Sequence, residues 1–221
     1  MNIFDIMGPV MIGPSSSHTA GALQIGYLAY IILNQVPAKA VIKFHGSFAE
    51  TYQGHGSDKA VVGGLLGYRP DDVRIRTSLQ DAISIGMHYK FETINILNAH
   101  PNTIVIEAET ADGIKTSIVG VSVGGGNIII KSLAGIDIEY TGSLNTLIVE
   151  MYDYMGAISQ ITGLFVAKCI NIERMRFFQS ENGRNKAIAI VETSDTLNDE
   201  IAETIQGLEK VTAAIYLPTI V

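Results

Sequence analysis

The 221-residue sequence contains only one cysteine, Cys169. A single thiol forms no disulfide within the chain, and alone it holds neither an iron–sulfur cluster nor a thiolate zinc site. Cys169 falls at helical spacing from Ile158, Thr162 and Phe165, which predicts a buried core thiol. We therefore assign no metal ligand to this chain.

Charged residues are also scarce, at 17% of the chain against roughly 25% in average soluble domains. Hydrophobic residues make up 47%, which is ample for a core. Two explanations of the low charge stand equally. A partner covers part of the surface, or a large sheet is buried on both faces.

The sequence also lacks a basic stripe, a long apolar run and a leader. Its net charge is −7 and its pI is near 5.2, so it offers no surface to the phosphates of nucleic acid. No apolar run approaches the roughly 20 residues of a membrane span. Residues 1–5 lack the basic start of a signal peptide. We expect a cytoplasmic protein with neither nucleic acid nor membrane as partner.

The sequence divides into two parts near residue 142. The C-terminal part, 145–221, alternates strand and helix patterns in the order βαββαβ, which is typical of a ferredoxin-like unit. The expected strands are Leu147–Met151, Ile172–Phe178, Lys186–Val191 and Val211–Leu217. One expected helix follows Gly156 with Ile158, Ile161 and Phe165 on one face, and another follows the cap Asn198. Residues 181–184 read as a hairpin turn.

The N-terminal part, 1–142, is less regular and predicts a mixed α/β domain. Helices are expected at about 18–33, 58–66 and 78–87, and strands at 41–45, 93–97, 103–109, 115–121 and 127–131. The predicted fold class is therefore α+β: an N-terminal mixed α/β substrate-site domain joined to a C-terminal ferredoxin-like domain.

The densest polar cluster runs from Gly13 to Gly21 and reads Gly-Pro-Ser-Ser-Ser-His-Thr-Ala-Gly. It lies at the start of the first predicted helix, where one hydroxyl normally caps a free backbone N–H. One cap does not explain three serines, a histidine and a threonine. Spare donors at a helix N-terminus favour a carboxylate or phosphate, and His18 adds a group that titrates near neutral pH. The alternative is an ordinary capping loop with a solvated histidine.

A second cluster, Gly54-His55-Gly56-Ser57-Asp58-Lys59, precedes another predicted helix, which Ser57 is expected to cap. Two such helix starts facing one cleft would make a polar anion pocket. The sequence does not show whether they face each other. A plain turn, made possible by the flanking glycines, is the alternative.

Three other patterns do not predict a functional site by themselves. Ser16-Ser17-His18 is not a serine-hydrolase arrangement, because no Gly-x-Ser-x-Gly elbow is present. Gly124-Gly125-Gly126 lacks the lysine of a phosphate loop and predicts a tight hairpin. His45, His88 and His100 are scattered without metal-ligand spacing.

The C-terminal part resembles an ACT domain in Asp153-Tyr154-Met155-Gly156-Ala157-Ile158 and in Ile170-Asn171-Ile172. The resemblance implies pairing between copies and an amino-acid effector held near Asp153, Gly156 and Asn171. Met155 departs from the proline that the family often has there, which leaves the loop less rigid. A purely dimerising role is the alternative, because fold does not fix function.

The serine cluster, the Gly54–Lys59 cluster through Ala60, and Ser122-Val123-Gly124-Gly125-Gly126 together resemble the iron–sulfur-dependent L-serine dehydratases. Length and the ACT-like part match the β subunit of the two-chain form. The resemblance implies conversion of L-serine to pyruvate and ammonia without pyridoxal phosphate. It also implies a [4Fe–4S] cluster held by cysteines of a separate α subunit, so that this chain is inactive alone.

The same resemblance places the quoted residues at the active site. His18 is the expected catalytic residue, for proton transfer or transition-state stabilisation. The expected substrate-binding residues are Ser15, Ser16, Ser17, Thr19, His55, Ser57 and Asp58. The alternative function is a standalone amino-acid-sensing protein in which the same cluster binds without catalysis.

Overall fold

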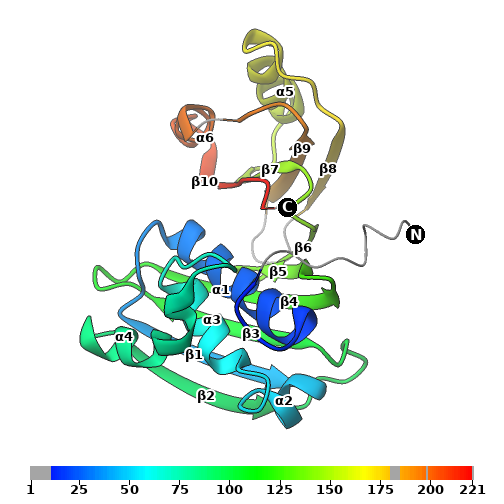
Figure 1. The fold of residues 1–221 in the computed structure, drawn as a ribbon. Helices are drawn as coiled ribbons and strands as arrows, with labels where there is room; N and C mark the ends of the chain where they lie inside the picture. Colours follow the sequence, from blue (N-terminus) through cyan, green and yellow to red (C-terminus); the bar gives the residue numbers. More distant parts are fainter. Residues whose placement is uncertain (1–10, 180–184, 198, 221) are drawn as a thin grey trace. The chain divides into compact units, whose positions relative to one another are not determined.

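The computed structural model describes residues 11–179, 185–197 and 199–220 (Figure 1). The predicted turn at 181–184 and the predicted cap Asn198 lie outside these residues. The chain divides into two compact units, Met1–Thr141 and Gly142–Val221.

The N-terminal unit combines short helices with one six-stranded sheet. Its helices are a π-helix Ser16–Ala20, α1 (Gly21–Leu33), α2 (Ser47–Thr51), α3 (Ser57–Leu65), a 3₁₀-helix Val73–Thr77 and α4 (Ser78–Ser84). Its strands are β1 (Lys39–His45), β2 (His88–Ile94), β3 (Thr103–Glu109), β4 (Lys115–Gly124), β5 (Asn127–Leu133) and β6 (Ile136–Tyr140).

The strand order of this sheet is β2-β1-β3-β4-β5-β6. β1 and β2 are parallel, with Lys39 opposite His88, and the other neighbouring strands are antiparallel. β1 and β4 therefore run in the same direction, so His45 and Ser122 lie at the same end of the strands. The loops that follow β1 and β4 are consequently neighbours in space.

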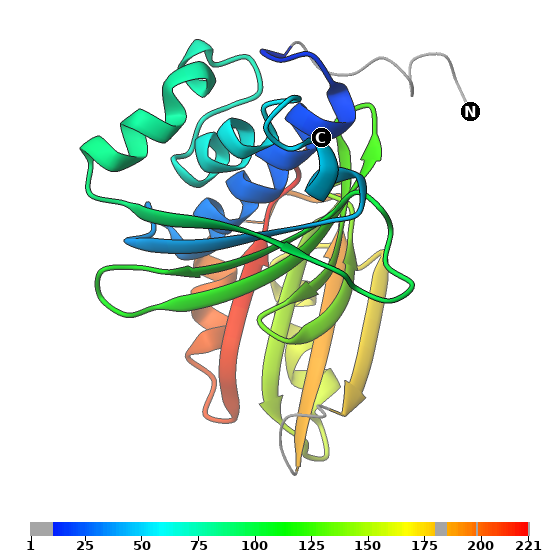
Figure 2. The ribbon, with the colours of Figure 1, turned by 90° about the horizontal axis from the view of Figure 1, so that it is seen from below.

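The helices of this unit cover one face of the sheet (Figure 2). Alternate side chains of the strands are buried beneath them, including Ile42, Phe44, Ile104, Ile106 and Ile118. This is the pattern of a sheet with one face packed on a core.

Two glycines bring α1 and α3 into close contact. A Cβ added to Gly26 would lie 2.2 Å from the Val61 carbonyl oxygen, and one added to Gly64 would lie 2.1 Å from that of Leu23. Residues nearer the two N-termini also meet, because Thr19 hydrogen-bonds the His55 carbonyl. The helices therefore run roughly parallel, and their N-termini lie at the same end of the unit.

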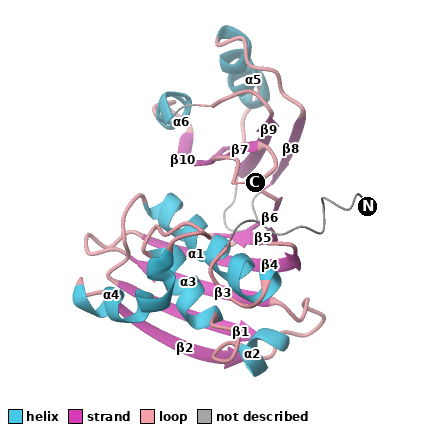
Figure 3. Cartoon of the chain, viewed as in Figure 1, coloured by secondary structure: helices cyan, strands magenta, loops and turns pink. Residues whose placement is uncertain are grey.

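The C-terminal unit has the predicted order βαββαβ (Figure 3). It consists of β7 (Asn145–Tyr152), α5 (Ala157–Ala167), β8 (Arg174–Gln179), β9 (Lys186–Thr193), α6 (Asp199–Gln206) and β10 (Val211–Leu217). The antiparallel sheet has the order β10-β7-β9-β8. Leu147, Val149 and Met151 share one core with Phe165 of α5 and Ile201 of α6, so both helices pack on one face. The ferredoxin-like topology is thereby confirmed.

Several local predictions were wrong. The strand expected at 93–97 is β2 (His88–Ile94), which starts sooner because Gly86, with φ of 82°, ends the preceding helical segment early. Ser57 does not cap α3 but is its first residue, and the N-cap is Gly56. α2 and β6 were not predicted.

Cys169 is exposed, which contradicts the predicted core thiol. α5 ends at Ala167, and Cys169 has the left-handed φ of 56°. The helical spacing that placed it with Phe165 therefore no longer applies at this position. Ile158, also expected on the buried face, is 46% exposed, whereas Ala157, Ile161 and Phe165 are buried.

Candidate active site

The serine cluster lies where the π-helix begins, next to the loops that follow β1 and β4. Ser15 caps the π-helix, because its Oγ accepts a hydrogen bond from the His18 backbone N–H at 3.1 Å. The same Oγ lies 3.4 Å from His18 Nδ1. His18 Nε2 lies 3.0 Å from the Oγ of Ser47, the first residue of α2. Hydroxyl groups thus hold both ring nitrogens of His18.

Sequence reasoning missed Ser47. The sequence feature that could have revealed it is its position just after a predicted strand, because functional loops gather at the carboxyl ends of strands. Gly46 turns the chain there with φ of 57°, and an added Cβ would lie 2.6 Å from the Pro101 carbonyl oxygen. That close approach fixes the path from β1 to Ser47.

The two predicted clusters meet at their histidines. The ring centroids of His18 and His55 are 4.7 Å apart, and Phe48 packs edge-on against His18 at 5.0 Å. Burial lowers the pKa of His18 below its usual value, and the charge of His55 lowers it further. His18 is therefore neutral at physiological pH, the form that accepts a proton.

We expect the pKa of His18 to rise in the His55→Gln variant, because the like charge is removed. It should stay below the usual value, since burial, the larger cause, remains. His55 Nδ1 is buried without a hydrogen-bond partner among the described residues, so the change breaks no bond at that atom. Titration of the imidazole proton resonances by NMR measures the shift. An unchanged or lower pKa would contradict the coupling.

The glycine-rich hairpin supports the serine cluster. Gly125 and Gly126 form the tight turn between β4 and β5, as predicted, with φ of 62° and 84°. Just before it, Ser122 Oγ donates a hydrogen bond to the Ser17 carbonyl at 2.7 Å. A Cβ on Gly21 would lie 2.1 Å from that Oγ, so the hairpin and the start of α1 fit only with glycine there.

The other predicted site residues differ in what they offer a ligand. Thr19 Oγ1 donates to the His55 carbonyl at 3.0 Å. The hydroxyls of Ser16 and Ser17 make no hydrogen bond within the described residues and remain available. Ser57 is fully buried, and its Oγ has no partner among the described residues. Contact of Ser57 with a substrate stays a prediction.

The carboxylate of Asp58 accepts a hydrogen bond from the backbone at the start of α3. Its Oδ1 accepts the Lys59 N–H at 2.8 Å. Burial raises the pKa of Asp58, and the hydrogen bond from Lys59 opposes that rise. Asp58 thus secures the first turn of α3 in this arrangement.

A cleft of about 480 Å³ lies between the two clusters. It is lined by Ile12, Gly13, Pro14, Thr19, Gln53, Gly54, His55, Gly56, Lys59, Ile75 and Arg76. Of the predicted site residues it includes Thr19 and His55. Sequence reasoning assigned no role to Lys59 or Arg76, and Arg76 belongs to neither cluster.

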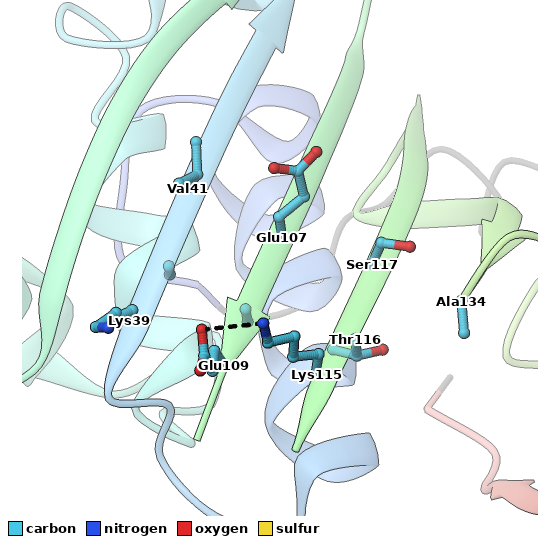
Figure 4. Close-up of a pocket in the computed structure, with 10 residues that line it drawn as sticks. Lys39, Val41, Glu107, Glu109, Lys115, Thr116, Ser117 and Ala134 are labelled. Carbon is cyan, nitrogen blue, oxygen red and sulfur yellow. Dashed lines mark ion pairs between the residues drawn. The ribbon is translucent and has the colours of Figure 1, made fainter. Parts of the chain in front are cut away.

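A second cavity, of about 500 Å³, crosses β1, β3 and β4 (Figure 4). Lys115 pairs there with Glu109 at 3.7 Å, and Glu107 pairs with Lys43. Lys115, where the cavity meets β4, lies seven residues from Ser122, which is roughly 24 Å along a strand. Its two acids are paired to lysines, and it contains none of the predicted site residues.

Only two of the three predicted effector residues line a common cavity. Asp153 and Gly156 line a cavity of about 210 Å³ at the start of α5, together with Phe177 of β8. Asn171 does not line it, and its backbone N–H donates to the Asp195 carboxylate at 2.7 Å.

Within the described residues, no three histidine, cysteine or acidic side chains gather closely enough to hold a metal ion. Nor is any helix in that part of the chain both long and apolar enough to cross a membrane.

Comparison with known proteins gives a consistent result. The family model for the serine dehydratase beta chain matches residues 2–88. The L-serine dehydratase beta chain of Peptoniphilus asaccharolyticus is 39% identical over 97% of this chain and 96% of its own length. The probable L-serine dehydratase beta chain of Bacillus subtilis is 36% identical over 95% and 94%. L-serine dehydratase 2 of Escherichia coli is 31% identical over 71% of this chain and 38% of its own length.

Among solved structures, the ACT domain of a GTP pyrophosphokinase from Chlorobium tepidum covers 34% of this chain and 84% of that one. The identity is 18% and the TM-score 0.26. This match adds nothing to the topology given by the strand pairing.

Proposed function

The chain belongs to the family of L-serine dehydratase beta chains, and from that membership we propose that it is the β subunit of an enzyme that converts L-serine to pyruvate and ammonia. The observation that carries the proposal is the meeting of the serine cluster and the Gly54–Lys59 cluster at the His18–His55 pair. The fold alone would not require two loops to place a neutral imidazole beside free hydroxyls.

The residues of this chain do not fit an iron–sulfur cluster. Such a cluster needs several cysteine thiolates, and the only cysteine is Cys169, in the other unit from His18. We assign the [4Fe–4S] cluster to a separate α subunit, and pyridoxal phosphate has no part in the proposal. The contribution of the β subunit is then to bind and orient L-serine and to move a proton.

His18 is the proposed catalytic residue. Loss of water from L-serine requires removal of the proton on the α-carbon, and a neutral imidazole accepts a proton near neutral pH. Ser15 and Ser47 act as positioning residues, because their hydroxyls fix the ring from both nitrogens. The low pKa of His18 keeps the ring unprotonated before the reaction.

The substrate-binding role falls on groups around this imidazole. Ser16 and Ser17 have hydroxyls free of other described residues, and Thr19 and His55 line the adjacent cleft. Ser57 and Asp58 would support the loop from behind, since one is buried and the other is bonded to the backbone.

For the C-terminal unit we propose an ACT domain that binds an amino-acid effector and pairs with a second copy. The cavity beside Asp153 and Gly156 supports the effector site. It is also the observation that favours the second candidate function, a standalone amino-acid-sensing protein.

Assembly is the direct test of the subunit role. We expect this chain, expressed together with a cysteine-bearing dehydratase α chain, to form one complex in analytical ultracentrifugation. Each chain run by itself provides the control. Separate sedimentation of the two chains at micromolar concentration would contradict the proposal and favour the sensing function.

A further inference from the structure

The cleft beside His55 carries positive charge from two different elements. Lys59 lies in the first turn of α3, and Arg76 lies in the 3₁₀-helix Val73–Thr77. No aspartate or glutamate is among the residues that line the cleft. The cleft therefore has the charge needed to receive a small anion.

The charge of Lys59 acts on the adjacent Asp58, which does not line the cleft, but no salt bridge holds either cation in the described part of the chain. Lys59 and Arg76 form no ion pair within the described residues. By contrast, Arg74, two residues from Arg76, pairs with Asp72 at 2.6 Å, and Lys43 pairs with Glu107. An arginine and a lysine left unpaired around one cavity indicate a ligand that brings the counter-charge.

Several backbone N–H groups at the two helix starts already have acceptors. The N–H groups of His18 and Thr19 donate to Ser15, that of Lys59 to Asp58, and that of Ala60 to Gly56. These four N–H groups are therefore not available to an anion, and the positive charge that would hold it comes from Lys59 and Arg76.

We propose that Lys59 and Arg76 form the subsite for the carboxylate of the substrate, a small α-amino acid. His55 lines the cleft, and its ring centroid is 4.7 Å from that of His18. The cleft therefore adjoins the proposed catalytic residue through His55, and a carboxylate bound there would bring the adjacent α-carbon to the His18 side of the cleft. This inference rests on the proposed function and adds the residues that recognise the charge.

The first test is binding to the full chain, with sodium pyruvate and L-serine as probes in calorimetric titrations. Lys59→Gln and Arg76→Gln should each weaken binding about tenfold, the usual effect of losing a charged hydrogen-bond partner. The matched control is Arg74→Gln, which removes a cation that does not line the cleft and should leave affinity unchanged. Equal weakening in all three variants would overturn the subsite, as would no binding by the unaltered chain.

The second test is kinetic and uses the assembled enzyme. Both cleft variants should raise KM for L-serine about tenfold while kcat changes little, because the carboxylate does not react. They should also lose the preference for L-serine over L-serinamide, which lacks the carboxylate charge. Normal KM in active variants overturns the subsite and leaves the proposed function intact. An assembled enzyme that never deaminates L-serine refutes the function, and the binding data then decide the subsite alone.

Discussion

Replacing His18 with alanine should lower turnover of L-serine by the assembled enzyme on the order of 10²- to 10⁴-fold, the range for losing a general base. The imidazole is the group between Ser15 and Ser47 that is neutral and able to take a proton. Initial rates of pyruvate formation measure the loss.

Two controls separate this chemical effect from misfolding. His88→Ala removes an exposed histidine on β2, outside both clusters, and should leave turnover unchanged. The His18→Ala variant should still form the complex with the α subunit and keep its thermal midpoint. Full turnover in a correctly assembled His18→Ala enzyme would remove His18 from the mechanism.

Gly64→Ala should lower the free energy of unfolding by about 2–3 kcal/mol, the usual effect of overpacking a buried contact. The added methyl would lie 2.1 Å from the Leu23 carbonyl oxygen and 2.5 Å from the Tyr27 nitrogen, so the two helices must separate. Because this crossing sets the distance between Thr19 and His55, turnover should fall as well.

The adjacent glycine gives a matched control. In Gly63→Ala the new methyl meets only side chains, the nearest atom being 3.4 Å away on Tyr68. Alanine also favours the helix over glycine, so stability should rise by up to about 1 kcal/mol. Urea denaturation of the two variants measures the difference. Equal effects at both positions would contradict the close packing of α1 against α3.

The C-terminal fold could be predicted because its signals are local. Alternating residues such as Leu147, Val149 and Met151 mark a strand within a few positions, and the element order then limits the topology. In the N-terminal unit, β3 (Thr103–Glu109) has its predicted bounds for the same reason. α2 spans only five residues, too few for a helical period to show.

The candidate site was predictable in its parts and not in its assembly. Both polar clusters stood out in the sequence, but their meeting depends on Gly26 and Gly64, which are 38 positions apart. Ser47 belongs to neither cluster, and Arg76 lies in a polar stretch with no recognisable site pattern, so composition did not mark them. Their proposed roles follow from tertiary placement that a local pattern does not contain.

Cys169 illustrates the opposite error, in which a periodic pattern was extended too far. The spacing from Phe165 is helical, but the helix stops at Ala167, and a left-handed residue turns the chain outward. A pattern predicts burial only as far as the element that carries it continues.

The most direct test of the account is anaerobic deamination of L-serine by this chain, alone and mixed with the cysteine-bearing α chain. We expect pyruvate formation in the mixture and none from this chain alone. If neither sample formed pyruvate while an amino acid still bound to the chain, the result would contradict the enzymatic role and support a sensing protein.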